Sequence, residues 1–289
     1  MNKVSKITIF TNPERDINFE YTKNIIAFAK RCNIAVYTDE RFADILANSG
    51  AEFLSEQELI LEGADLVIVL GGDGSMLDAC EKNASGNSPV LGINLGNLGF
   101  LTSLERVEFE ELYEVFAGHF EIEERMMLEV KIADGDFKKT FNVLNEVVIT
   151  SSVCAKIAEI ELHCDNSVAM RCSSDGIIIA SPTGSTAYSL SAGGPIIDPT
   201  LEAICVTPVC PHSLTARPLV FGSGVVLDVH GSTKDKHNNG LLVTPDGKDG
   251  IFVSKNAKIS VTRSPLKTKL VKVNKNRFFD ILSTKMYRK

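Results

Sequence analysis

The sequence predicts two domains, an α/β domain built on an open, mostly parallel sheet and a mainly β domain of the sandwich type. At 289 residues the chain is long for a single hydrophobic core. In its first third, short apolar runs alternate with stretches of helical spacing, which is typical of βαβ units. After Gly118 the pattern changes to short strands separated by turn signals, which is typical of antiparallel structure.

The composition excludes several classes of protein. Hydrophobic residues make up 44% of the chain and charged residues 23%, as in ordinary globular proteins. No apolar run approaches the ~18 residues that cross a bilayer. The start of the chain has no hydrophobic signal stretch, so we expect a cytoplasmic protein that does not bind membranes. The net charge of -7 argues against a nucleic-acid-binding protein.

Cysteine usage and the basic C-terminal stretch favour simple explanations. The seven cysteines include no Cys-x-x-Cys pair, so free thiols are expected, and no second pair could complete a zinc site at His163 and Cys164. We therefore predict no structural metal.

From Lys255 to Lys289 there are eleven Lys or Arg residues and one acid, Asp280. Protection of sheet edges by lysine explains this stretch most simply, and contact with nucleotide phosphates or an acidic subunit is the alternative.

The first domain is predicted over residues 1–104. Its expected elements are strands at 4–11, 33–38, 66–70 and 90–94, with helices at 19–32, around 42–46 and from 76 to 83 and a polar segment after residue 46. This alternation predicts a Rossmann-like sheet whose ligands bind beyond the carboxyl ends of the strands. A glycine-rich loop at 92–101 indicates tight turns near a ligand or against the second domain.

The stretch from Asp65 to Leu77 is the first candidate site, because a buried strand ends there at glycines that enclose Asp73. Ser75 can cap a helix that begins at Met76. Amides at the start of a helix bind anions, and glycine permits close approach of a ligand. The candidate phosphate-binding residues are therefore Gly71, Gly72, Gly74 and Ser75.

The second domain is predicted over residues 105–275. A helix at 109–116 comes first, followed by strands at 120–132, 141–150, 156–164, 167–171, 176–180, 225–230, 241–244, 251–253, 258–261 and 270–273. Residues 276–289 are expected to be helical or irregular and to return to the first domain. Asp134-Gly135 and Asp165-Asn166 are turn signals between strands.

The second candidate site is the stretch from Ser174 to Pro195, which is rich in small and hydroxylated residues. Ser185 or Thr186 can cap a short helix, whose first amides would bind a polar ligand. Tyr188 can lie against a flat base. A capped turn with a packed tyrosine is the purely structural alternative.

Three further acids, Glu146, Asp175 and Asp246, are candidates for ligand contacts. Asn145-Glu146 interrupts an apolar strand, and ribose hydroxyls would satisfy both side chains, although a hydrogen bond to the backbone would serve as well. Asp175 and Asp246 each precede a glycine, and turn formation explains them about equally well. Neither the dinucleotide fingerprint nor a P-loop is present, so a nucleotide site here must be of another kind.

Taken together, these motifs resemble those of the bacterial NAD kinases. The resemblance covers most of the chain and includes Gly71-Gly-Asp-Gly74, Asn145-Glu146, Asp175-Gly176, the stretch Ser181 to Pro195, Pro211-His212 and Arg217-Pro218. The glycine–acid motif is shared with phosphofructokinases and lipid kinases. The long motif at 181–195 is highly specific.

The resemblance implies transfer of the ATP γ-phosphoryl group to the 2′-hydroxyl of the adenosine ribose of NAD, with Mg²⁺ or another divalent cation carried on ATP. It implies that Asp73 is the general base and that Gly74 lets the ribose approach. It also implies an NAD site made of Asp73, Gly74, Asn145, Glu146, Lys156, Ser173, Asp175, Thr186, Ala187, Tyr188, Ser189, Leu190, Ser191 and Lys248. Relatives often carry a basic residue at Ser173 and glutamine at Lys248. A homodimer or homotetramer is implied as well.

Two other functions are compatible with parts of the sequence. A kinase of the same glycine–acid type could act on a sugar phosphate or a lipid, but this leaves the stretch at 181–195 unexplained. The chain could instead be a dinucleotide-sensing module without catalysis, and the presence of Asp73 argues against that.

Overall fold

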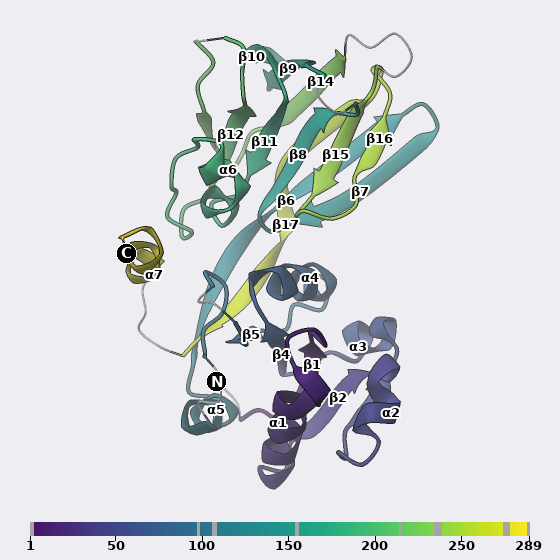
Figure 1. The fold of residues 1–289 in the computed structure, drawn as a ribbon, viewed down its shortest axis with the longest axis vertical. Coiled ribbons are helices and arrows are strands. Elements are labelled where there is room, and N and C mark those ends of the chain that lie inside the picture. Colours follow the sequence, from purple (N-terminus) through teal and green to yellow (C-terminus); the bar gives the residue numbers. More distant parts are fainter. Residues whose placement is uncertain are drawn as a thin grey trace. The chain divides into compact units, whose positions relative to one another are not determined.

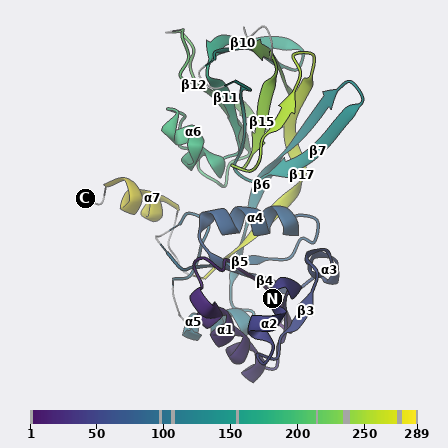
Figure 2. The ribbon, with the colours of Figure 1, turned by 45° about the vertical axis from the view of Figure 1, so that its right-hand side comes forward.

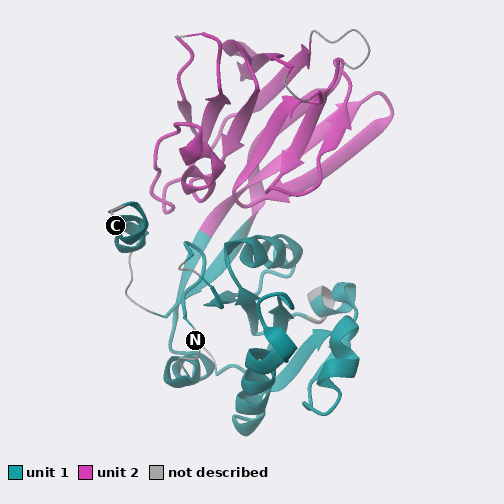
Figure 3. Ribbon diagram, viewed as in Figure 1, with its two compact units in different colours: residues 1–124, 267–289 teal, residues 125–266 magenta. Residues whose placement is uncertain are grey.

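The computed structural model describes residues 3–96, 99–105, 109–153, 156–213, 215–233, 239–273 and 278–287. The chain forms two compact units, which are coloured separately in Figure 3: unit 1 is residues 1–124 with 267–289, and unit 2 is residues 125–266. The boundaries that we placed at residues 104 and 275 remain predictions. No helix among the described residues is both long and apolar enough to cross a membrane.

Unit 1 alternates strands and helices. Its elements are β1 (Lys6–Thr11), η1 (Ile17–Phe19), α1 (Glu20–Arg31), β2 (Ala35–Asp39), η2 (Glu40–Phe42), α2 (Ala43–Leu46), β3 (Glu52–Leu54), α3 (Glu56–Glu62), β4 (Leu66–Gly71), α4 (Asp73–Asn83), β5 (Val90–Asn94), α5 (Phe109–Phe116) and α7 (Phe278–Tyr287). The first five strands pair in parallel in the order β5-β4-β1-β2-β3. The predicted open parallel sheet is confirmed.

The topology of this sheet marks a place for a ligand. β1 and β4 are neighbours, but the helices that follow them, α1 and α4, cover opposite faces of the sheet (Figures 1 and 2). At such a switch in direction, the chain leaves a crevice beyond the carboxyl ends of the two strands. Every residue of β4 is buried, which fixes this strand firmly in the middle of the unit.

One part of unit 1 differs from the prediction. The stretch after residue 46, for which we predicted only a polar segment and no element, contains β3 and the seven-residue helix α3. Ser55 caps α3, because its Oγ accepts a hydrogen bond from the Glu58 amide (3.4 Å) while the Glu58 carboxylate accepts one from the Ser55 amide (2.8 Å). Two helical turns are too short for an apolar period to reveal them.

Unit 2 is a two-layer β structure. Its elements are β6 (Glu121–Asp134), β7 (Phe137–Val143), β8 (Glu146–Ser151), β9 (Ala158–Cys164), β10 (Ser167–Ser174), β11 (Gly176–Ala180), η3 (Gly184–Thr186), α6 (Tyr188–Ser191), β12 (Ala203–Val209), β13 (Leu219–Gly222), β14 (Leu227–Thr233), β15 (Leu241–Pro245), β16 (Ile251–Val253) and β17 (Lys258–Lys272). β6 and β17 also extend into unit 1.

The two layers are separate sheets that enclose one core. The first contains β10-β9-β14-β17 with β6 and β7, and the second has the order β13-β12-β11-β8-β15-β16. Leu162 and Val229 from the first sheet and Ile149, Ile177 and Val243 from the second belong to the same buried cluster. This confirms the predicted mainly β, sandwich-like domain.

Several strands of unit 2 differ from the prediction. β12 and β13 were not predicted, and Pro208 inside β12 weakens its strand signal. The strands predicted at 258–261 and 270–273 are one continuous strand, β17. The strand predicted at 141–150 is interrupted, because β7 ends at Val143 and β8 begins at Glu146. That interruption places Asn145 in a connection and not inside a strand.

Candidate active site

The first group of candidate residues lies at the carboxyl end of β4. Gly71 ends β4, Gly72 precedes α4, and Asp73 is the first residue of the helix. The helix therefore starts earlier than predicted, and Ser75 lies in its first turn and does not cap it. The Ser75 hydroxyl instead accepts a hydrogen bond from the side-chain amide of Asn12 (3.2 Å), the residue that follows β1. This bond joins the two strand ends at the switch point.

The Asp73 carboxylate is held in one direction by the loop that follows β5. Its two oxygens accept hydrogen bonds from the amides of Phe100 (2.9 Å) and Leu101 (3.0 Å). Gly99 makes this contact possible, since a Cβ at that position would lie 2.1 Å from Oδ1 of Asp73. The Asp73 side chain is nevertheless 35% exposed. The carboxylate is thus oriented and still accessible to a substrate.

Two cations that the sequence did not single out lie beside this motif. Lys285 of α7 places its Nζ 3.9 Å from Oδ2 of Asp73 and 4.3 Å from the centre of the Phe100 ring. The guanidinium of Arg15 lies beside Gly72 and Gly96, where added Cβ atoms would be 3.4 Å and 2.1 Å from its Nη1. Both cations are far from the motif in sequence. The basic C-terminal stretch was the one signal that included Lys285.

A cavity of ≈ 430 Å³ opens at the same switch point of unit 1. Asn12, Gly74 and Ser75 contribute to its lining, together with Arg41 and Lys82. Asn12 follows β1, and Gly74 and Ser75 lie in the first turn of α4, whereas Arg41 is in η2 after β2 and Lys82 is in the last turn of α4. The candidate phosphate-binding loop therefore borders a space large enough for part of a nucleotide.

In unit 2, the turn at Asn145-Glu146 is fixed by Asp246. The Asp246 carboxylate accepts hydrogen bonds from the amides of Leu144 (2.8 Å), Asn145 (2.9 Å) and Glu146 (2.9 Å). The amide of Asp246 in turn donates to the carbonyl of Glu146 (2.9 Å). An ordinary turn was an adequate explanation of Asp246 in the sequence, and the structure shows that this residue also holds the neighbouring candidate site.

Glu146 is a buried acid with an unsatisfied oxygen. Its side chain is 6% exposed, and its Oε2 has no hydrogen-bond partner. Burial, and to a lesser extent the negative charge of Asp246, raise the pKa of Glu146 from its ordinary value of 4.5 to about 8. The protonated form of this carboxyl is therefore favoured to a much higher pH than in an exposed glutamate. A buried acid with an unsatisfied oxygen and a raised pKa is typical of a functional site.

The long motif in unit 2 lies directly against this turn. The Ser181 amide donates to the Asn145 carbonyl (2.8 Å), and Ala180 is paired with Glu146 across the sheet. A Cβ at Gly184 would lie 2.2 Å from the Asn145 oxygen, so glycine permits the close approach of the two segments. The structure thus brings together the two motifs of unit 2.

The short helix in this motif is not capped as predicted. α6 has only four residues, and Ala187 precedes it without a side-chain cap. Ser185 is instead buried, with its hydroxyl donating to the Pro182 carbonyl (2.7 Å) and accepting from the Ile197 amide (3.0 Å). Tyr188 is 45% exposed, which leaves its ring free to contact a ligand.

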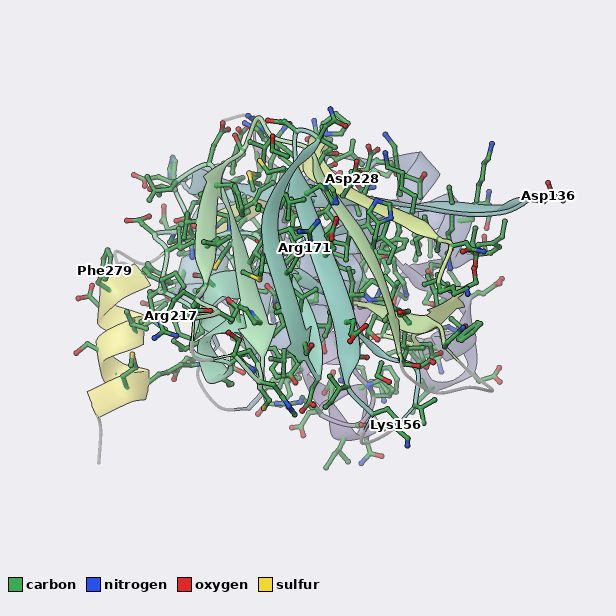
Figure 4. The ribbon with its side chains drawn as sticks, turned by 90° about the horizontal axis from the view of Figure 1, so that it is seen from above. Asp136, Lys156, Arg171, Arg217, Asp228 and Phe279 are labelled. Atoms are coloured by element: carbon green, nitrogen blue, oxygen red, sulfur yellow. The ribbon has the colours of Figure 1, made fainter. Side chains whose placement is uncertain are left out.

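The remaining predicted residues of unit 2 have varied surroundings. Ser189 is fully buried, and its hydroxyl lies 2.9 Å from that of Thr207. Ser173 accepts a hydrogen bond from the His212 amide through its carbonyl (2.8 Å). Thr186, Ala187 and Leu190 are half-buried, whereas Ser191, Asp175, Lys156 and Lys248 are exposed. Figure 4 labels Lys156, which lies apart from Arg171 of β10.

Within the described ranges, no three His, Cys, Asp or Glu side chains are grouped so as to hold a metal ion.

The raised pKa of Glu146 predicts a pH-dependent effect of Glu146→Gln on stability. Between pH 4.5 and about 8, Glu146 is protonated in the folded state but ionised in the unfolded chain. The free energy of unfolding of the wild type should therefore fall as the pH rises through this range. The glutamine variant does not ionise, and its stability relative to wild type should rise across this range by at most about 1.4 kcal/mol per pH unit. Urea unfolding at several pH values measures this difference. A difference that does not change with pH would contradict the prediction.

Comparison with known sequences identifies both halves of the chain. The sequence model of the ATP-NAD kinase N-terminal domain matches residues 7–123, and that of the ATP-NAD kinase C-terminal domain matches residues 144–273. An NAD kinase of Thermoanaerobacter sp. is 34% identical over 285 residues, which cover 98% of this chain and 99% of that protein. An NAD kinase of Clostridium tetani is 41% identical over 229 residues, with coverages of 78% and 82%.

Solved structures show the same fold. Yeast NADH kinase, in a complex with NADH, has a TM-score of 0.88 at 23% identity and covers 98% of this chain and 87% of that chain. An NAD kinase from Archaeoglobus fulgidus, in a complex with ATP, has a TM-score of 0.75 at 25% identity, with coverages of 96% and 98%. The chain therefore belongs to the NAD kinase family and is a phosphotransferase of the kinase type.

Proposed function

We propose that this protein transfers the γ-phosphoryl group of ATP to the 2′-hydroxyl of the adenosine ribose of NAD, with Asp73 as the general base. The observation that carries this proposal is the Asp73 carboxylate, which two loop amides orient at the first turn of α4 while it stays accessible. Its support is the family membership, together with two solved relatives that are complexes with NADH and with ATP.

In this mechanism Asp73 accepts the proton of the ribose hydroxyl as the new bond between that oxygen and the γ-phosphorus forms. The bond from the γ-phosphorus to the oxygen shared with the β-phosphate breaks, so that ADP leaves and NADP is formed. Such reactions depend mainly on positioning and on neutralising charge. The fixed direction of the Asp73 carboxylate supplies the first of these requirements.

For the phosphates we propose the loop of Gly71, Gly72, Gly74 and Ser75. The amides at the start of α4 would face the phosphate oxygens, as is usual at helix N-termini. Arg15 and Lys285 bring positive charge to the same loop. Mg²⁺ or another divalent cation would arrive with ATP as part of the substrate.

For NAD we propose the residues of unit 2 that the resemblance indicated. Asn145 and Glu146 would bind ribose hydroxyls, with the protonated Glu146 carboxyl donating a hydrogen bond. The exposed ring of Tyr188 would lie against a base, with Thr186, Ala187, Ser189, Leu190 and Ser191 around it. Lys156, Ser173, Asp175 and Lys248 would contribute polar contacts. Assembly into a homodimer or homotetramer stays a prediction.

The proposed function predicts that the purified protein forms NADP from NAD, ATP and Mg²⁺. Chromatographic detection of NADP measures the reaction, and polyphosphate in place of ATP in a parallel sample shows which donor is used. Absence of NADP with both donors, while a known NAD kinase is active in the same buffer, would contradict the proposal.

The role of Asp73 predicts that Asp73→Asn lowers kcat by roughly 10²- to 10⁴-fold, the usual contribution of a general base. Because asparagine keeps the shape of the side chain, the Kd for NAD should change much less than kcat. Asp44→Asn, on the exposed surface of α2, is the matched control and should leave kcat unchanged. If NAD binding and kcat fell in parallel in Asp73→Asn, Asp73 would be a binding residue and not mainly a base.

The role of Gly74 predicts opposite effects of Gly74→Ala on stability and turnover. Gly74 lies inside α4, and an added Cβ would meet no atom within 4 Å. Alanine should therefore stabilise the protein by about 0.5 to 1 kcal/mol, which thermal unfolding can detect. The same methyl group should hinder the ribose or the phosphates and lower kcat/KM. Full activity in this variant would show that no ligand approaches Gly74 closely.

A further inference from the structure

We propose that Asp246 is a positioning residue for NAD binding: its carboxylate fixes the backbone from Leu144 to Glu146 and thereby sets the direction of the Glu146 side chain. This inference rests on the proposed function, because the target of Glu146 is a ribose of bound NAD. It concerns a residue that does not itself have to touch the substrate.

The geometry shows why this backbone needs Asp246. β7 ends at Val143 and β8 begins at Glu146, so the amides in the connection have no regular ladder partner. The two oxygens of Asp246 accept all three amides from Leu144 to Glu146 at 2.8 to 2.9 Å. Buried amides without an acceptor are costly, so one carboxylate determines this whole connection.

The conformation of Asp246 restricts what can replace it. Its φ of 42° lies in the left-handed region, which Asp, Asn and Gly tolerate best. Asp246→Asn therefore preserves the backbone conformation and the size of the side chain. It removes the negative charge, however, and turns an NH₂ group toward at least one of the three amide donors.

The same carboxylate also affects the protonation of Glu146. Across the sheet, Glu146 faces the uncharged Ala180 of β11. On the other side Val147 faces Pro245 of β15, and the next residue, Asp246, donates its amide to the Glu146 carbonyl, so the charged group beside Glu146 is Asp246. Burial is the main cause of the raised pKa of Glu146, and Asp246 is the charged group that adds to it. Asp246 thus helps Glu146 to act as a hydrogen-bond donor, and NAD affinity should fall as pH rises through about 8.

The experiment compares Asp246→Asn with wild type in the full chain, using two measurements. In ¹³C NMR of protein labelled at the glutamate carboxyls, the titration of Glu146 should move to lower pH in the variant, because a neighbouring negative charge is gone. In calorimetric titrations with NAD between roughly pH 6 and 9, the alkaline loss of affinity should move in the same direction. At neutral pH, the Kd for NAD should rise about tenfold, while the KM for ATP should not change.

The matched control is Asp134→Asn in the same unit. The Asp134 carboxylate also fixes backbone, since it accepts hydrogen bonds from the amide (2.7 Å) and the hydroxyl (2.6 Å) of Ser254. This variant should lose thermal stability but keep both the Glu146 titration and the affinity for NAD. Equal effects of the two variants on NAD affinity would overturn the proposal, because they would show that Asp246 acts only through general stability.

Measurements on the wild type also test the role of Asp246. If Asp246→Asn does not fold, the amide signals of Leu144, Asn145 and Glu146 in the wild type should shift together, with one common midpoint, in a pH titration followed by NMR. Independent shifts would overturn the proposal, and so would an unchanged Glu146 titration in a folded Asp246→Asn variant. If the wild type neither binds NAD nor forms NADP, the proposed function fails, and the Glu146 titration still decides the role of Asp246.

Discussion

Backbone amides in the connections next to strands need acceptors, and in both units of this protein a carboxylate supplies them. In unit 1, Asp73 accepts the amides of Phe100 and Leu101 after β5. In unit 2, Asp246 accepts three consecutive amides before β8. Each interaction satisfies backbone that leaves a sheet, and each fixes the direction of a side chain that the proposed chemistry uses. The candidate residues of each unit therefore depend on bonds between a carboxylate and backbone amides next to a sheet.

The acids proposed to act on the substrate have contrasting surroundings. Asp73 is accessible and has two amide donors, with Lys285 at 3.9 Å. Glu146 is buried, has one oxygen without a partner, and lies close to a second negative charge. In the proposed mechanism one carboxyl takes up a proton and another holds hydroxyl groups. The different environments of the two acids agree with that division of roles.

Sequence patterns predicted those parts of the fold and site that depend on neighbouring residues. The buried run of β4, the strands β5 and β11 and the helix α5 each lie where their local pattern indicated. The helix caps were wrong, since α4 begins before Ser75, and α3 was too short to show a period. Arg15, Lys285 and the role of Asp246 could not be found, because each reaches its partner only through tertiary structure. Asp246 is about one hundred residues from the amides that it binds.

The glycines of the candidate site show how local and tertiary requirements differ. The sequence suggested that Gly71, Gly72 and Gly74 leave room for a ligand. A Cβ at Gly71 would instead lie 2.3 Å from the Ser75 hydroxyl, and one at Gly99 would lie 2.1 Å from the Asp73 carboxylate. These two glycines make room for other parts of the protein. At Gly74, by contrast, a Cβ would meet no protein atom within 4 Å. No contact within the protein therefore requires glycine there, and close approach by a substrate would explain it.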